Sequence, residues 1–138
     1  MARFPFCPDL HPCEEMRGGE RVFALVHGLS YPNGDYVPVG FKTDGISFPR
    51  VVRSFLAKMG KGFSTAIGHD YDYAVQEGTR KEADYKAYKR WQQEGLPQAR
   101  AYTYYVMLRH WGWIAWNNNK KRDRSYFFED LGSLKLPK

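Results

Sequence analysis

The strongest constraint on the fold is a series of helix-start and helix-stop signals in the second half of the chain. Thr79-Arg-Lys-Glu82 has the form of a capping box, in which a threonine caps a helix and a glutamate three residues later completes the cap. Gly78 precedes this box and Gly95 follows it, at positions where glycine commonly ends helices. Pro97 suits the first turn of another helix. The three predicted helices therefore span about residues 64–77, 79–95 and 97–119.

The first half of the chain is predicted to form a small antiparallel sheet. Two β-prone runs, residues 21–29 and 35–41, flank Tyr31-Pro-Asn-Gly34, and Asn-Gly is typical of hairpin turns. After a loop over residues 42–50, Ser47 and Pro49 favour the start of a short helix. The sequence thus predicts an α+β fold, with a small antiparallel β-hairpin or sheet packed on a bundle of about four helices.

The length of the chain predicts a single domain over residues 1–138. Residues 1–19 are rich in proline and glycine, which indicates an irregular N-terminal arm. A core is expected over residues 20–118 and a C-terminal tail over residues 119–138.

The composition narrows the classes of partner. The net charge of +6 suits an anionic envelope or an acidic partner. Nucleic acid is not expected, because no nucleic-acid motif accompanies the charge. There is no apolar segment typical of a signal peptide, and no window approaches the ~20 apolar residues of a membrane span. Cys7, His11 and Cys13 match no standard zinc element, which favours thiols over a zinc site.

Two carboxylates fall on the apolar faces of consecutive predicted helices. Asp70 lies in a stripe at helical spacing with Phe63, Ile67 and Ala74. Asp84 lies in a similar stripe with Ala87, Tyr88 and Trp91. A carboxylate that faces a core is costly unless it is hydrogen-bonded or bound to a cation, so both carboxylates are expected to have partners.

The turn at Gly78 should fold these two helices into an antiparallel hairpin. Counting outward from the turn places Tyr73 level with Asp84, and His69 lies one helical turn from Tyr73. His69, Tyr73 and Asp84 are therefore expected to converge, with Asp70 beside them. Three interpretations are open: a histidine base oriented by a carboxylate, a cation site built from Asp70 and other oxygens, or a structural polar network.

Three motifs of the chain resemble a known family. "VPVGFKTDGISFPR", "GHDYDY" and "TRKEADYKAY" are similar to V-P-x-G-F-x-T-D-G-A-S-x-P-R, H-D-Y-x-Y and R-x-E-A-D, which mark an uncharacterised domain family of tailed bacteriophages and prophages. The resemblance covers roughly residues 36–90 and departs at Ile46, where the family usually has alanine. A similar Trp-Gly-Trp element follows later. The resemblance implies a phage origin and maps onto Thr43, Asp44, Ser47, Pro49, His69, Asp70, Tyr73, Glu82 and Asp84.

A more local resemblance concerns mechanism. His-Asp-x-x-Tyr on one helix, answered by an aspartate on an antiparallel helix, is similar to the site of secreted phospholipases of the A-two type. The resemblance implies that His69 is a base that activates water, that Asp70 is a ligand of calcium, and that Tyr73 and Asp84 brace the histidine. The glycine-rich calcium loop and the disulfide framework of those enzymes are absent from this sequence.

Two functions follow. One is a phage-encoded hydrolase of an envelope component, either a phospholipid or the cell wall, with a divalent cation held by Asp70 as the expected cofactor. Its catalytic residues would be His69, Asp70, Tyr73 and Asp84, with Thr43, Asp44 and Ser47 as substrate or loop residues. The alternative is a non-catalytic virion component of the tail, baseplate or neck, with other virion proteins as partners. In either case the protein is expected in the virion or in the host cytoplasm.

The long predicted helix is rich in aromatic residues. These residues would either form a substrate wall or fill the core, as aromatic residues at such spacings usually do. We expect most of the five in the core: Tyr102, Tyr105, Trp111, Trp113 and Trp116.

Overall fold

The computed structural model describes residues 10–17, 20–43 and 62–129. The described residues of Met1–Asp44 and Arg122–Lys138 form one compact unit, the sheet unit, and those of Gly45–Lys121 form a second, the helical unit. Together they contain four helices, a three-stranded antiparallel sheet and a two-stranded hairpin, so the predicted α+β fold is confirmed. The single domain stays a prediction, and the short helix predicted after Pro49 lies outside the described residues.

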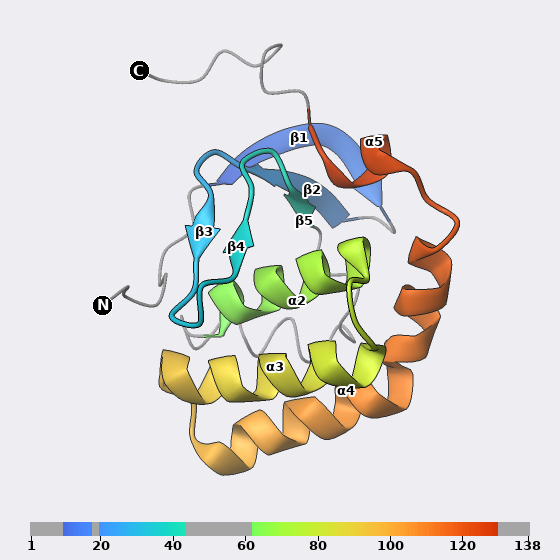
Figure 1. Cartoon of the computed structure of the whole chain (residues 1–138). Helices are drawn as coiled ribbons and strands as arrows, with labels where there is room; N and C mark the ends of the chain where they lie inside the picture. The colour runs from blue at the N-terminus through green and yellow to red at the C-terminus, as the bar shows by residue number, and fades with distance from the viewer. Residues whose placement is uncertain (1–9, 18–19, 44–61, 130–138) are drawn as a thin grey trace. The chain divides into compact units, whose positions relative to one another are not determined.

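The sheet unit is built on three antiparallel strands, with β2 (Glu20–Leu25) between β1 (Leu10–Arg17) and β5 (Lys42–Thr43). Figure 1 shows β1 and β2 as the long members of the sheet. The prediction of an irregular arm over residues 1–19 is wrong for Leu10–Arg17, because these residues form the strand β1. Proline is tolerated in β1 because an edge strand need not donate every backbone N–H to a ladder, and a register shift falls between Pro12 and Met16.

The predicted turn at Tyr31–Gly34 is confirmed, but its strands are short. β3 (Leu29–Ser30) pairs with β4 (Tyr36–Val37), and the Tyr31 N–H donates to the Asp35 carbonyl at 2.9 Å. The β-prone run at 21–29 is divided between β2 and β3, because β2 pairs with β1 and β5 instead of continuing the hairpin.

The tail predicted after residue 118 contains ordered structure that joins the sheet unit. A short helix, α5 (Arg124–Phe127), is followed by Phe128, which forms an isolated bridge with Phe41. The rings of Phe41 and Phe128 meet edge to face, with centroids 5.7 Å apart. Cys13 of β1 is a buried thiol, and burial raises its pKa to about 11.

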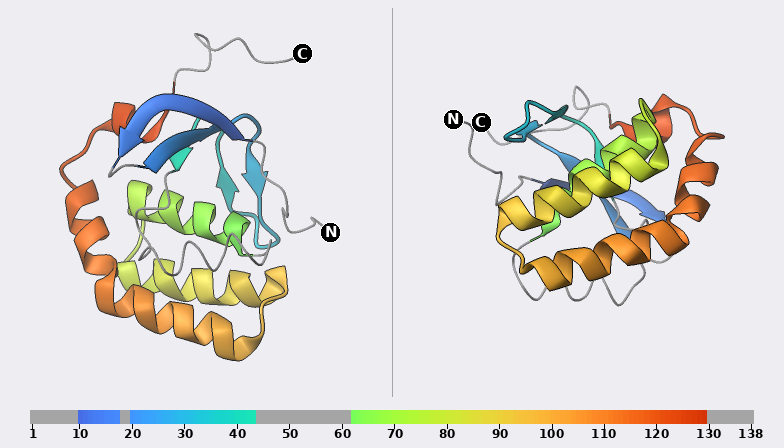
Figure 2. Two further views of the ribbon diagram at one scale, coloured as in Figure 1. Left: turned by 180° about the vertical axis from the view of Figure 1, so that it is seen from behind. Right: turned by 60° about the horizontal axis from the view of Figure 1, so that its bottom comes forward.

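The helical unit consists of α2 (Phe63–Val75), α3 (Arg80–Glu94) and α4 (Gln98–Asn119), with α3 packed against both of the others (Figures 1 and 2). The predicted caps of α3 are confirmed. Thr79 accepts from the Glu82 N–H at 3.1 Å, and Gly95 ends the helix with φ 107°. α2 ends earlier than predicted, because Gln76 adopts φ 51° while its side chain donates to the Trp116 carbonyl at 2.8 Å.

The core of the helical unit is formed by small and aromatic side chains from all three helices: Ala66, Ala87, Trp91, Leu96, Ala101, Tyr104 and Leu108. The expectation that most aromatic residues of α4 are buried is wrong. Tyr102, Trp111 and Trp113 are exposed, while Tyr105 and Trp116 are half-buried. Phe63 is also exposed, so the apolar stripe predicted for α2 begins at Ile67. None of the helices in the described part of the chain is long and apolar enough to span a membrane.

Candidate functional site

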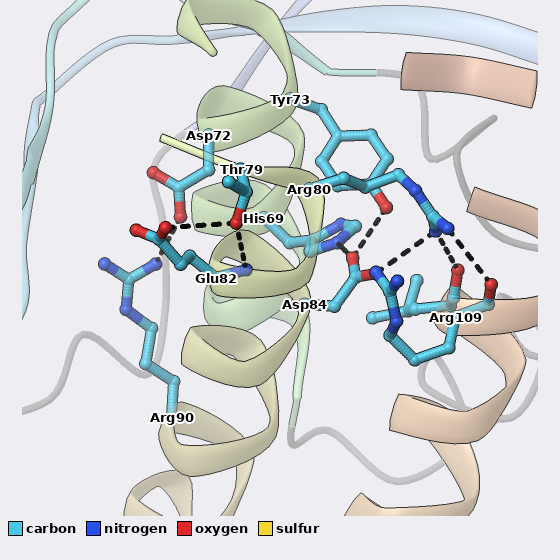
Figure 3. Close-up of polar contacts among 10 residues, drawn as sticks. His69, Asp72, Tyr73, Thr79, Arg80, Glu82, Asp84, Arg90 and Arg109 are labelled. Carbon is cyan, nitrogen blue, oxygen red and sulfur yellow. Dashed lines mark hydrogen bonds and ion pairs between the residues drawn. The ribbon is translucent and has the colours of Figure 1, made fainter. Parts of the chain in front are cut away.

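Asp84 of α3 is the centre of a buried polar network within the helical unit. Its Oδ1 atom lies 2.8 Å from Nε2 of His69 and accepts a hydrogen bond from the Tyr73 hydroxyl at 2.6 Å. All three side chains are buried, and the rings of His69 and Tyr73 lie together with centroids 4.1 Å apart. Figure 3 shows both α2 side chains pointing toward Asp84. The predicted convergence of His69, Tyr73 and Asp84 is therefore confirmed.

The other oxygen of Asp84 is held by two arginines. Arg109 of α4 donates to Oδ2 at 2.7 Å, and Arg80 donates to it at 3.3 Å (Figure 3). Arg80 also donates to the carbonyls of Leu108 and Arg109, at 3.0 and 3.3 Å. The network thus ties all three helices together.

Neither arginine was assigned a role from the sequence. Arg80 lies four residues before Asp84 on the same helix, a spacing at which opposite charges meet, so that signal was available. Arg109 comes from a later helix and has no comparable local signal.

The environment of Asp84 fixes the proton positions of the network. Burial raises the pKa of its carboxyl, but hydrogen bonds from His69, Tyr73 and Arg109 outweigh burial and bring the pKa below its usual value. Burial and the Asp84 charge raise the pKa of Tyr73, whose hydroxyl stays a donor. Since an ionised carboxylate only accepts, Nε2 of His69 must carry a proton, so Nδ1 is the ring nitrogen that can act as a base.

Asp70 is buried, but the hydrogen bonds to Asp84 described above come from other residues. Among the residues that the structure describes, no group of three or more His, Cys, Asp and Glu side chains is placed to hold a metal ion. A cation ligated by Asp70 therefore stays a prediction. Thr43 is buried in β5 of the sheet unit, and Asp44 and Ser47 lie outside the described residues.

A second set of ion pairs joins α2 to α3 away from Asp84. Asp72 lies 3.3 Å from Arg90 and 3.6 Å from Lys86. Asp72 also lines a cavity of about 200 Å³ over the turn between the two helices, together with Val75, Glu77, Gly78, Thr79, Glu82, Ala83, Lys86 and Trp116. His69 and Asp84 do not line this cavity.

The family of the chain can be stated from its sequence. A family model described as a protein of unknown function (DUF1353) matches residues 23–108. The chain belongs to this family. The part matched to DUF1353 includes His69, Tyr73, Arg80 and Asp84 and ends one residue before Arg109. No curated protein and no solved structure matches the chain.

Proposed function

We propose that this chain is a phage-encoded hydrolase of the bacterial envelope in which His69 is the general base. The observation that carries the proposal is the contact of 2.8 Å between His69 Nε2 and Asp84 Oδ1, with Tyr73 on the same oxygen. A carboxylate in this position holds the imidazole in one tautomer and one orientation. The phage origin is supported by the motifs shared with a family of tailed phages and prophages, and the substrate is an ester or amide of a phospholipid or of the cell wall.

The proposed reaction uses the second nitrogen of the ring. His69 Nδ1 removes a proton from water, and the water oxygen attacks the carbonyl carbon of the substrate. The imidazolium then returns the proton to the leaving oxygen or nitrogen. Arg80 and Arg109 offset much of the Asp84 charge, so Asp84 contributes mainly by orienting His69.

A second candidate is a non-catalytic virion component, in which the same network only braces the helices. It is favoured by the burial of His69 and by the four partners of Asp84, because a closed and saturated network is typical of a structural role. The partners would be other virion proteins, and the protein would be found in the particle.

The test compares the purified full-length protein with His69→Gln, whose side-chain amide can still donate to Asp84 but cannot act as a base. We expect fatty-acid release from phospholipid vesicles, or dye release from labelled peptidoglycan, to fall by about 10²-fold or more in His69→Gln at an unchanged melting temperature. His110→Gln, at an exposed histidine of α4, is the matched control and should retain activity.

Wild type that cleaves neither substrate, or His69→Gln that cleaves as well as wild type, would refute the hydrolase. Mass spectrometry of purified particles then tests the second candidate. Absence of the chain from the particles would exclude a virion component.

A further inference from the structure

A cluster of four tyrosines lies on the surface of the helical unit where α3 and α4 run side by side. We call Tyr85, Tyr88, Tyr102 and Tyr105 the tyrosine surface. The centroid distance is 6.0 Å between the rings of Tyr88 and Tyr102 and 6.2 Å between those of Tyr85 and Tyr105. Tyr85 is 48% exposed and Tyr102 is 55% exposed, although aromatic rings of this size usually gain by burial.

The tyrosine surface continues along α4 toward the Asp84 network. Val106, Arg109 and Trp113 follow Tyr102 at spacings that keep them on one side of the helix. Val106 is 47% exposed and Trp113 is 53% exposed. Arg109 is one of the two arginines that donate to Asp84, so the exposed aromatic side of α4 leads directly to a member of the candidate site.

Most of the charges around this surface are positive. α4 contains no aspartate or glutamate along its whole length. On α3, Lys81 and Lys89 are exposed one turn to either side of Tyr85, and the Lys89 ammonium lies 5.4 Å from the centre of the Tyr85 ring. Of the α3 carboxylates, Asp84 and Glu94 are buried, and Glu82 is exposed but accepts from the Thr79 hydroxyl.

We propose that the tyrosine surface, with Val106 and Trp113, docks the protein onto an anionic phospholipid membrane. Tyrosine and tryptophan favour the headgroup level of a bilayer, where the ring meets apolar chains and the polar tip stays wet. Exposed lysines beside them, Lys81 and Lys89, are attracted to anionic headgroups. The inference rests on the proposed function and makes a phospholipid the substrate class. The surface formed by α3 and α4 would contact the membrane.

The two other occupants of such a surface fit less well. A second copy of the chain would bring together two surfaces that both carry the exposed Lys81 and Lys89, which like-charge repulsion opposes. Single-stranded nucleic acid needs ring faces on which bases can stack. Here Tyr88–Tyr102 and Tyr85–Tyr105 meet edge to face at 75°, so in each pair the edge of one ring blocks a face of the other.

The experiment measures vesicle binding by co-sedimentation in the full-length His69→Gln background, so that lipid hydrolysis cannot alter the vesicles. We expect binding to phosphatidylglycerol vesicles at least about tenfold tighter than to phosphatidylcholine vesicles, and weaker binding at high salt. Tyr102→Ser or Trp113→Ser should weaken binding by about tenfold, and Lys89→Glu by about thirtyfold. Trp111→Ser is the matched control, because Trp111 is 48% exposed on the opposite side of the same helix, and it should change binding by less than about twofold.

The inference is overturned if neither kind of vesicle binds, or if Trp111→Ser weakens binding as much as Trp113→Ser does. It is also overturned if Tyr102→Ser abolishes self-association or oligonucleotide binding while vesicle binding is absent. Vesicle binding by a wild-type protein that hydrolyses nothing would support the docking surface and refute the hydrolase. Hydrolysis of a soluble short-chain ester without vesicle binding would do the reverse.

Discussion

Gly112 leaves the space that Tyr73 needs in order to reach Asp84. A Cβ atom at residue 112 would lie 2.3 Å from the Tyr73 hydroxyl oxygen and 3.1 Å from Nη1 of Arg80. Both of these atoms are donors to Asp84. The glycine of the Trp-Gly-Trp element is therefore a condition of the network, although it makes no hydrogen bond to Asp84 itself.

Gly112→Ala should destabilise the protein. In an exposed helix interior, alanine is more stable than glycine by about 0.5–1 kcal/mol. At residue 112 the collision with Tyr73 makes alanine less stable than glycine. We expect Gly112→Ala to lower the free energy of unfolding by about 1–3 kcal/mol, measured by urea denaturation. Asn117→Ala, at an exposed position of the same helix, is the control and should be neutral or slightly stabilising.

The same collision can be tested by removing the atom that it involves. In a Tyr73→Phe background the hydroxyl is gone, so Gly112→Ala should cost less than it does in wild type. A double-mutant cycle measures this coupling. Equal costs in both backgrounds would show that Gly112 serves something other than Tyr73.

The contributions of Arg80 and Arg109 to the free energy of unfolding should depend on each other. Arg80→Met loses the bond to Asp84 and two bonds to α4 carbonyls, so we expect it to lose about 2–3 kcal/mol of unfolding free energy. Arg109→Met loses one contact, at 2.7 Å, and should lose about 1–2 kcal/mol, because Arg80 still holds the carboxylate.

The double variant leaves Asp84 buried without either guanidinium, so its loss should exceed the sum of the single losses. Urea unfolding of the four proteins gives the coupling, with Lys120→Met at an exposed position as the control. Strict additivity would mean that the two arginines act independently of each other.

The sequence predicted local features of the fold better than distant ones. The Thr79 cap, the Gly95 stop and the Tyr31–Gly34 turn depend on neighbouring residues, and all three are confirmed. β1 was not predicted, because the strand is stabilised by pairing with β2 and its own sequence carries no signal of that pairing.

In the candidate site, too, contacts that depend on local patterns were predicted and contacts that depend on distant packing were not. Helical periodicity and the position of one turn were enough to predict that His69 and Tyr73 contact Asp84. Arg109 and Gly112 could not be found by that reasoning, because the packing of α4 against the hairpin decides which of its residues reach the network. The exposed aromatic residues of α4 were mispredicted because a spacing typical of a core does not say whether another element covers it.

Asp84→Asn should lower stability in a way that depends on pH. At pH 7 we expect a loss of about 2–4 kcal/mol, since both arginines lose their ion pair with Asp84 but remain partly exposed. The pKa of Asp84 is lowered on folding, so its contribution is present above the unfolded pKa of about 3.9 and is lost as pH falls through the lower folded value. Urea unfolding from pH 7 down to pH 3 should show the difference between wild type and Asp84→Asn shrinking at the acid end. A difference that is constant with pH would mean that the Asp84 charge does not stabilise the fold.

Glu94 should show the opposite dependence on pH. This buried carboxyl of α3 caps α2, accepting from the backbone N–H groups of Gly62 and Thr65 and from the Thr65 hydroxyl at 2.7 Å. Burial raises its pKa more than these donors lower it, so the folded protein binds the proton more tightly than the unfolded chain.

The stability from this group is therefore complete below the unfolded pKa of about 4.3 and is lost as pH rises through the raised folded value. Glu94→Gln keeps an acceptor for Thr65 and removes the titration, so the advantage of wild type over Glu94→Gln in urea unfolding should shrink as pH rises from 4 to 8. Glu94→Ala leaves the α2 donors unsatisfied, so it should be less stable than Glu94→Gln by about 2–3 kcal/mol at every pH. An advantage of wild type over Glu94→Gln that grows with pH would show that the capping hydrogen bonds, and not burial, control the charge of Glu94.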